Sequence, residues 1–224
     1  VFLLFLLIVG LLLAGVPIIG PSFGRERSYE AYANGFDATA YQDAGNLHFY
    51  ANGQMPESSP EHPGGELNEA VATARAASPG QPLVVTEAGY HTAPEARNPD
   101  GVLTGASEEA AAVYLPRMLL GLKNEEVART YLFELRDHRD FGPQDQESHF
   151  GLLRWDGTRR PAFGAMARLF SALDDPGPAH TPEPFAYELT DDLGGEVRTR
   201  LFGRRDGSYV LAVWRAVPVW DPVT

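Results

Sequence analysis

Three side chains that can do chemistry stand on two apolar segments of the chain. The segment "VVTEAG" (84–89) ends its apolar run in Glu87, and "NLHFY" (46–50) carries His48 and Tyr50. An ionised carboxylate is costly to remove from water, so Glu87 is either an ordinary strand end or a reactive group at the rim of a core. A tyrosine hydroxyl that donates to this carboxylate would orient it and favour the ionised form, which a nucleophile needs.

The spacing of these residues decides which of them can meet. Alternate residues of an extended strand share a face, so Asn46 is expected beside His48 and Tyr50, and Glu87 on the face of Val85. If both faces line one interior, a carboxylate, an imidazole and a phenol meet at its rim. Spacing alone leaves the catalytic interpretation of Glu87 and the solvated strand end both open.

The elements that must position these groups alternate between strands and helices. Apolar spacing predicts strands at 16–24, 46–50, 82–89 and 128–137, and helices over 66–77, from Ser107 to about residue 122, and over 161–173. This order implies parallel strands with helical crossovers, and therefore an α/β fold. In such folds the reactive groups lie at the carboxyl ends of strands, which is where Glu87 falls.

Both ends of the chain differ from this α/β part in composition and in hydrophobic pattern. Residues 1–15 form an apolar, uncharged segment that is shorter than the roughly twenty residues of a membrane span. We interpret it as the core of a signal segment or as a buried helix, and the first interpretation predicts an extracellular or cell-envelope protein. A proline-rich linker (174–184) follows. In residues 185–224, segments of alternating apolar and polar residues are separated by Gly-Gly and Asp-Gly turns, which predicts part of an antiparallel β-sandwich.

Composition excludes several function classes. The chain has 224 residues, a net charge of −12 and no cysteine. Such an acidic surface repels phosphate backbones and anionic lipid, so neither nucleic acid nor a membrane is an expected partner beyond a possible signal or anchor segment. Disulfides, thiolate nucleophiles and cysteine-ligated metals are unavailable. The strong preference for arginine over lysine is compatible with a GC-rich bacterial genome.

Three segments together resemble a known family of enzymes. The segments "VVTEAG", "HFY" and "HFGLLRWDGTRRPAFGAM" look like the second half of a clan A retaining glycoside hydrolase of the cellulase-like type. The resemblance covers roughly residues 17–172. It implies that residues 16–173 are strands five to eight of a (β/α)8 TIM barrel, followed by a truncated β-sandwich domain. It further implies a carbohydrate substrate and no cofactor.

The resemblance also assigns roles to single residues. Glu87 matches the nucleophile of the clan, and His48 and Tyr50 match a His-x-Tyr pair whose tyrosine orients it. The expected substrate-binding residues are Asn46, His48, His91, Phe133 and Glu134; for Glu134 an ion pair with Arg136 or another neighbour is the alternative. The acid/base glutamate of the clan would lie upstream of Val16, so the chain is expected to be an inactive fragment that supplies only the nucleophile.

Two other functions stay open at this point. A carbohydrate-binding protein could keep the barrel without the chemistry. A metal hydrolase could use His48, Glu87 and His91, although Gly89 places the last two in a loop, where their spacing implies no shared face.

Overall fold

The computed structural model describes residues 15–22, 39–57, 65–98, 101–102, 104–190 and 193–221. Its elements, in chain order, are η1 (Thr39–Tyr41), β1 (Gly45–Phe49), α3 (Leu67–Ala76), β2 (Leu83–Ala88), α4 (Glu108–Asn124), β3 (Arg129–Leu132), η2 (Gln146–Ser148), α5 (Pro161–Leu173), η3 (Leu193–Gly195), β4 (Val197–Gly203) and β5 (Tyr209–Arg215). Apart from Gly15, the apolar segment 1–15 lies outside the described residues.

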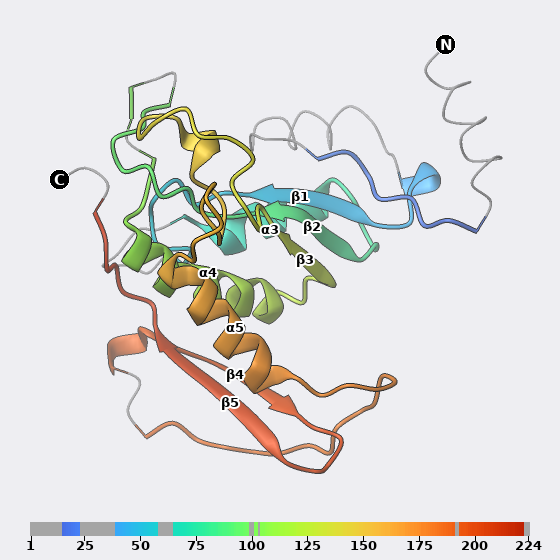
Figure 1. Ribbon diagram of the computed structural model, residues 1–224. Coiled ribbons are helices and arrows are strands. Elements are labelled where there is room, and N and C mark those ends of the chain that lie inside the picture. Colours follow the sequence, from blue (N-terminus) through green and yellow to red (C-terminus); the bar gives the residue numbers. More distant parts are fainter. Residues whose placement is uncertain are drawn as a thin grey trace.

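The predicted α/β arrangement is confirmed for the middle of the chain. Strands β1, β2 and β3 form one parallel sheet in that order, with α3 and α4 as the crossovers between them (Figure 1). Of the expected strand at 16–24, the described residues 16–22 keep only one parallel bridge, between Ile19 and Ala44 just before β1. Pro17 and Pro21 flank this bridge, and neither can donate to a ladder, so the pairing ends after it starts.

The sequence explains where the helices begin. The Ser107 side chain accepts a hydrogen bond from the Ala110 N–H and so caps α4, as its position before two glutamates predicts. Pro161 opens α5, where a missing N–H costs nothing. Both helices bury an apolar stripe against neighbouring elements.

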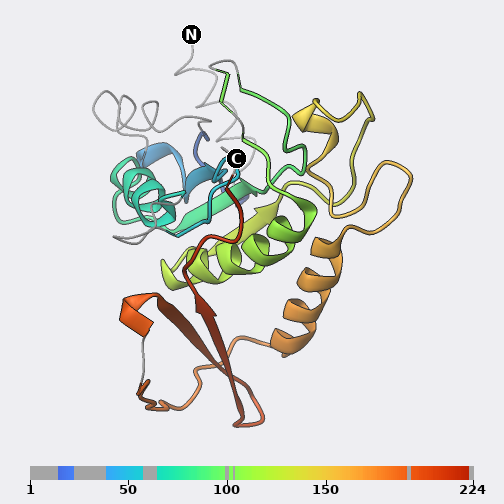
Figure 2. The ribbon, with the colours of Figure 1, turned by 90° about the vertical axis from the view of Figure 1, so that its left-hand side faces the viewer.

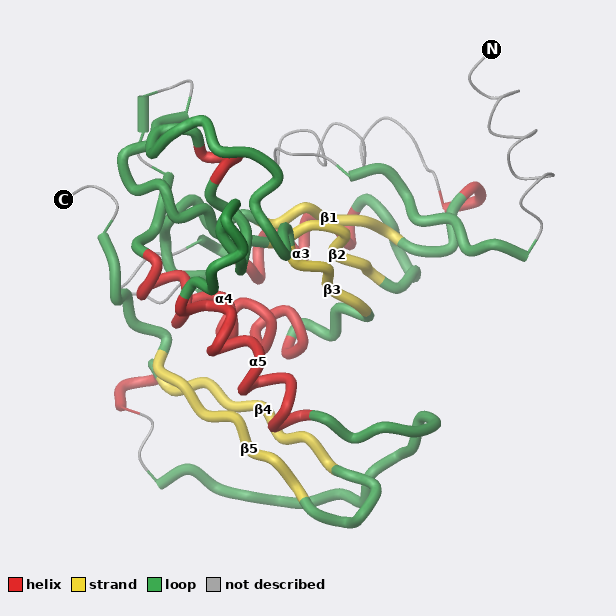
Figure 3. The backbone as a smooth tube through the Cα atoms, viewed as in Figure 1, coloured by secondary structure: helices red, strands yellow, loops and turns green. Residues whose placement is uncertain are grey.

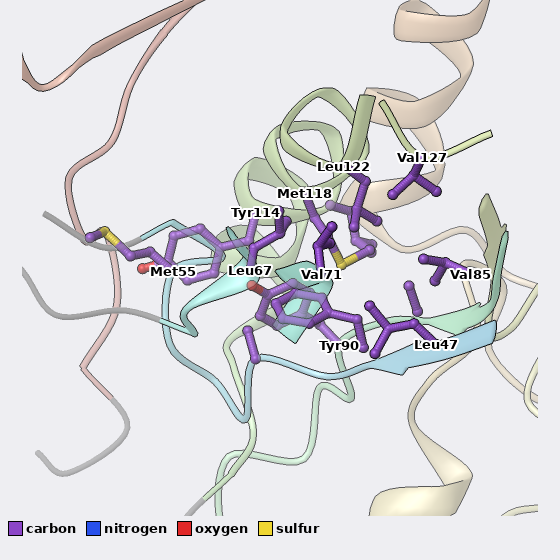
Figure 4. Packing of buried hydrophobic residues seen from close by; sticks show 14 of the residues in the cluster. Leu47, Met55, Leu67, Val71, Val85, Tyr90, Tyr114, Met118, Leu122 and Val127 are labelled. Atoms are coloured by element: carbon purple, nitrogen blue, oxygen red, sulfur yellow. The ribbon is translucent and has the colours of Figure 1, made fainter. Parts of the chain in front are cut away.

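One face of the sheet carries the hydrophobic core. Leu47 of β1 and Val85 of β2 point toward α3 and α4, where they lie close to Val71, Met118 and Leu122 (Figure 4). These side chains are almost fully buried. Each CH₂ group removed from water stabilises the folded state by about 0.8 kcal/mol. The helices therefore cover one face of the sheet, and the polar residues of β1 lie on the other.

The last part of the chain is an antiparallel hairpin of β4 and β5, as the Asp-Gly turn predicts. Helix α4 lies between this hairpin and the parallel sheet in both ribbon views (Figures 1 and 2). Residues 185–190, whose alternation contributed to the sandwich prediction, form a loop and not a strand (Figure 3). Phe185 stacks on the ring of Tyr209 across the face of the hairpin instead of pairing along its edge. A complete sandwich stays a prediction.

Buried polar contacts attach the hairpin to the α/β part. The Arg117 guanidinium on α4 pairs with Glu57 at 2.5 Å and donates to the carbonyl of Val217. The Trp214 indole donates to the same Glu57, and the Trp220 indole donates to the carbonyl of Gly105. The two parts of the chain therefore share a buried interface along α4.

Candidate active site

Glu87 stands at the carboxyl end of β2 with two partners on one oxygen. The Tyr50 hydroxyl donates to Glu87 Oε2 at 2.8 Å, and His48 Nδ1 lies 3.2 Å from the same oxygen. No described residue is hydrogen-bonded to Glu87 Oε1. The carboxylate side chain is about one third exposed (37%), so it can reach a ligand from solvent. The structure thus brings together the three groups that the sequence singles out.

A β-bulge places Glu87 on this face. His48 pairs with Glu87 across the ladder while Leu47 pairs with Val85, so Thr86 is an extra residue in β2. Strict alternation puts Glu87 on the face of Val85, which is wrong: Val85 points into the core beneath the helices, and Glu87 points to the opposite face with His48. The bulge also leaves Thr86 on the same face as Glu87.

The environment of Tyr50 keeps its hydroxyl protonated. Burial and the hydrogen bond to the Glu87 carboxylate raise the pKa of Tyr50 well above its usual range, and the charges of Glu147 and Glu134 add to the effect. The phenol therefore acts as a hydrogen-bond donor at every pH at which proteins are ordinarily studied. It can orient the carboxylate without competing for a proton.

An aromatic side chain that sequence reasoning missed packs beside the carboxylate. The Phe150 ring makes edge-to-face contacts with Tyr50, His91 and Phe133, with centroids 5.3 to 5.4 Å apart. Phe150 belongs to the segment "HFGLLRWDGTRRPAFGAM", in which the resemblance assigns no site residue. Its only sequence signal is a bulky aromatic before Gly151 in a polar loop.

Gly89 explains why a glycine follows Ala88 at this strand end. A Cβ on Gly89 would lie 2.2 Å from the carbonyl oxygen of Phe133. The Phe133 N–H donates to the carbonyl of Ala88, so the two chains run in close contact just beyond the strands. Only glycine permits this approach, which brings the Phe133 and Glu134 pair up to the site.

The remaining predicted residues lie around this centre. Asn46 donates to the carbonyl of Gly20 and accepts from Thr86, one step from His48. Glu134 lies 3.1 Å from His138, so its ion pair is with this neighbour. The alternative of a pair with a neighbour is therefore met by His138 and not by Arg136, whose guanidinium donates to the carbonyl of Trp155.

His91 is a buried histidine that stays neutral. Its Nε2 is 3.0 Å from the Thr104 hydroxyl, and its Nδ1 has no hydrogen-bond partner among the described residues. Burial, with a smaller contribution from His149, lowers the pKa of His91 to about 4. Its exposed fraction is 5%, so direct contact with a substrate needs a rearrangement of the loop.

His91 should make folding stability depend on pH. The folded pKa of about 4 lies below the unfolded value of about 6.5, so the unfolded chain binds the proton more tightly between them. The stabilisation is complete above about pH 6.5 and is lost as the pH falls, by about 3 kcal/mol at about pH 4. Chemical denaturation of His91→Gln should show a shallower loss of stability over this range than the original protein.

The control for this measurement is His180→Gln, a change at an exposed histidine of the linker. Because the only acidic contact of His180 among the described residues is with Asp175 at 4.0 Å, this substitution should change the slope of unfolding free energy against pH far less than His91→Gln does. An equal slope in His91→Gln and the original protein would contradict the assignment to His91.

The described residues offer no metal centre. They contain no group of three or more His, Asp or Glu side chains placed to hold a metal ion. The metal hydrolase built on His48, Glu87 and His91 therefore finds no site in this part of the chain. No helix among the described residues is long and apolar enough to cross a membrane.

Comparison with solved structures identifies the fold. The chain is similar to a family 17 β-1,3-glucanosyltransferase from Rhizomucor miehei (TM-score 0.51, 20% identity), covering 70% of this chain and 54% of that one. It is also similar to a family 39 glycoside hydrolase from Bacteroides cellulosilyticus (0.52, 19%; 83% and 36% covered) and a GH2 β-galacturonidase from Eisenbergiella tayi (0.54, 16%; 77% and 30%).

These similarities establish a glycoside hydrolase-like α/β fold with a parallel sheet, of which the chain spans about half or less of the matched structures. No protein-family model matches the sequence. No curated protein matches it either.

Proposed function

We propose that the protein is, in its full length, a retaining glycoside hydrolase in which Glu87 is the nucleophile. The observation that carries the proposal is the pair of contacts to one oxygen of Glu87, from Tyr50 and His48, at the carboxyl end of a parallel strand. This arrangement holds the carboxylate in one orientation and leaves Oε1 without a hydrogen bond from the described residues. The fold shared with glycoside hydrolases supports the same assignment.

The proposed reaction has two steps at the anomeric carbon of a β-linked sugar. Glu87 Oε1 attacks that carbon, the bond to the leaving oxygen breaks, and a glycosyl ester forms. Water then attacks the same carbon and releases Glu87 as a carboxylate. A second carboxyl group must protonate the leaving oxygen and later activate the water. In the resemblance, the counterpart of that group precedes residue 16, and its presence is part of this proposal.

A labelling experiment tests the nucleophile without the second carboxyl group. In 2,4-dinitrophenyl 2-deoxy-2-fluoro-β-glycosides the leaving group departs without acid assistance, and the fluorine slows hydrolysis of the ester. Incubation with a panel of gluco, galacto, xylo and glucurono forms, followed by peptide mass spectrometry, should find one added sugar on Glu87. Absence of label from a folded protein, or label that persists in Glu87→Gln, would refute the proposal and favour a carbohydrate-binding protein.

Tyr50→Phe should slow this labelling while the protein stays folded. The change removes a hydrogen bond to a charged acceptor, worth about 1.5 to 3 kcal/mol, which corresponds to roughly a 10- to 100-fold lower rate. The ring contact with Phe150 is retained. Tyr131→Phe, at an exposed tyrosine of β3, is the matched control and should label at the original rate. Equal rates for both variants would show that the Tyr50 hydroxyl does not assist Glu87.

A further inference from the structure

A chain of hydrogen bonds runs behind the His48 ring on the side away from Glu87. Asn46 Nδ2 donates to the carbonyl of Gly20 at 3.1 Å. The Thr86 hydroxyl donates to Asn46 Oδ1 at 2.8 Å, and His48 Nε2 lies 3.0 Å from the Thr86 oxygen. The bulge in β2 makes this possible, because it places Thr86 and Glu87 against opposite nitrogens of one imidazole.

The direction of every hydrogen bond in this chain is fixed by its far end. The carbonyl of Gly20 can only accept, so the nitrogen of the Asn46 amide must face it and the amide oxygen must face Thr86. The single proton of the Thr86 hydroxyl is then used on that oxygen. The Thr86 oxygen can only accept from His48, so His48 Nε2 must carry a proton.

This assignment determines what His48 can offer to Glu87. Once Nε2 holds the proton of the neutral ring, Nδ1 faces Glu87 Oε2 as a bare lone pair, which repels an ionised carboxylate. With the hydrogen bonds of this chain in place, only a ring protonated on both nitrogens makes an attractive contact with an ionised Glu87. A neutral ring protonated on Nδ1 would also make one, and the Thr86 chain is what disfavours it.

We infer that Thr86 and Asn46 are positioning residues that fix the His48 tautomer with the proton of the neutral ring on Nε2, so that only the doubly protonated ring makes an attractive contact with an ionised Glu87 carboxylate. The tautomer follows from the hydrogen bonds alone, whereas the benefit to the nucleophile rests on the proposed function. In the doubly protonated state, His48 and the Tyr50 hydroxyl together hold Glu87 Oε2, and the attack falls to Oε1. The charges of Glu134 and Glu147 also act on Tyr50 at this site.

Nitrogen NMR of the folded protein tests the tautomer directly. With ¹⁵N-labelled histidine, His48 Nε2 should resonate as a protonated nitrogen over the whole pH range in which the protein is folded, whatever the state of Nδ1. Thr86→Ser keeps the hydroxyl and should give the same spectrum. Thr86→Val removes it, so the neutral ring should move its proton to Nδ1 and show a bare Nε2.

Asn46→Ala separates hydrogen-bond direction from simple contact. It keeps the Thr86 hydroxyl but frees its proton, which can then be donated to His48 Nε2. The proton of the neutral ring should therefore move to Nδ1 in this variant too. Asn124→Ala, which removes a distant bond from α4 to the hairpin, is the control and should change nothing at His48.

The two failures remain distinguishable because the spectrum requires no turnover. A bare Nε2 in the original protein, or an unchanged His48 spectrum in both Thr86→Val and Asn46→Ala, would overturn the inference.

Discussion

Glu87→Gln should abolish turnover of an aryl β-glycoside in the full-length enzyme, with kcat lower by roughly 10⁴-fold or more. Glutamine keeps the shape of the side chain but cannot form the glycosyl ester. Glu87 is partly exposed at a strand end, so the free energy of unfolding should change by less than about 1 kcal/mol. Initial rates and thermal unfolding of the same preparation measure the two quantities.

Glu134→Gln is the matched control for this prediction. Glu134 is the carboxylate that follows the neighbouring strand β3, and it pairs with His138. Its replacement should cost far less activity than that of Glu87. Undiminished activity in Glu87→Gln would exclude this residue as the nucleophile, and a larger loss in Glu134→Gln would transfer the role to Glu134.

Chemical rescue gives a second measure of the same role. In Glu87→Ala the space of the lost carboxylate can admit azide, which attacks the anomeric carbon directly while the leaving group departs with its electron pair. The product from a β-glycoside should be an α-glycosyl azide, detectable by proton NMR. A β-azide, or no rescue alongside high residual activity, would indicate that Glu87 does not attack this carbon.

The sequence predicted the site better than it predicted the geometry that builds it. Residue types and the i, i+2 spacing placed His48 and Tyr50 on one face of β1, and the structure has both of them at Glu87. Alternation failed for Glu87 itself, because an extra residue in β2 reverses the alternation after Val85. A bulge depends on how the backbone pairs with the neighbouring strand, and the side-chain pattern of β2 does not predict it.

The hydrophobic pattern of the sequence also did not predict contacts between loops that are far apart along the chain. Phe150 comes from a loop about one hundred residues after Tyr50 and yet packs on its ring. Local periodicity carries no information on such pairs. At 185–190 the pattern misled in the other direction. The residues alternate as in a strand, but the segment contacts the hairpin through the rings of Phe185 and Tyr209 and forms no β-ladder.

Arg160→Met should produce the largest loss of stability among single changes near the site. The Arg160 guanidinium is almost fully buried, and it contacts Asp137 at 2.9 Å, Glu108 at 3.2 Å and the carbonyl of Gly151 at 2.7 Å. Removing one partner of a buried ion pair costs about 3 to 5 kcal/mol, since the other charge remains without compensation. Urea denaturation should show this loss, with a melting temperature lower by roughly 10 °C.

The neighbouring Arg159 provides the control for this change. It is exposed, and its guanidinium lies over the ring of Phe163, so Arg159→Met should cost less than about 1 kcal/mol. A loss of similar size in both variants would show that the buried network contributes no more than a surface arginine.

A double variant distinguishes two effects: the loss of attraction between Arg160 and Asp137, and the cost of leaving one buried charge without its partner. Asp137→Asn alone should also destabilise the protein, because it weakens the contact with Arg160. The amide oxygen introduced by this change can still accept from the N–H of Gly151, as the carboxylate of Asp137 does at 2.7 Å. Combined with Arg160→Met it leaves no unpaired charge between the two positions, so the double variant should be more stable than the sum of the single losses predicts, by about 1 to 3 kcal/mol. If the losses in unfolding free energy were simply additive, Arg160 and Asp137 would stabilise the protein independently of each other.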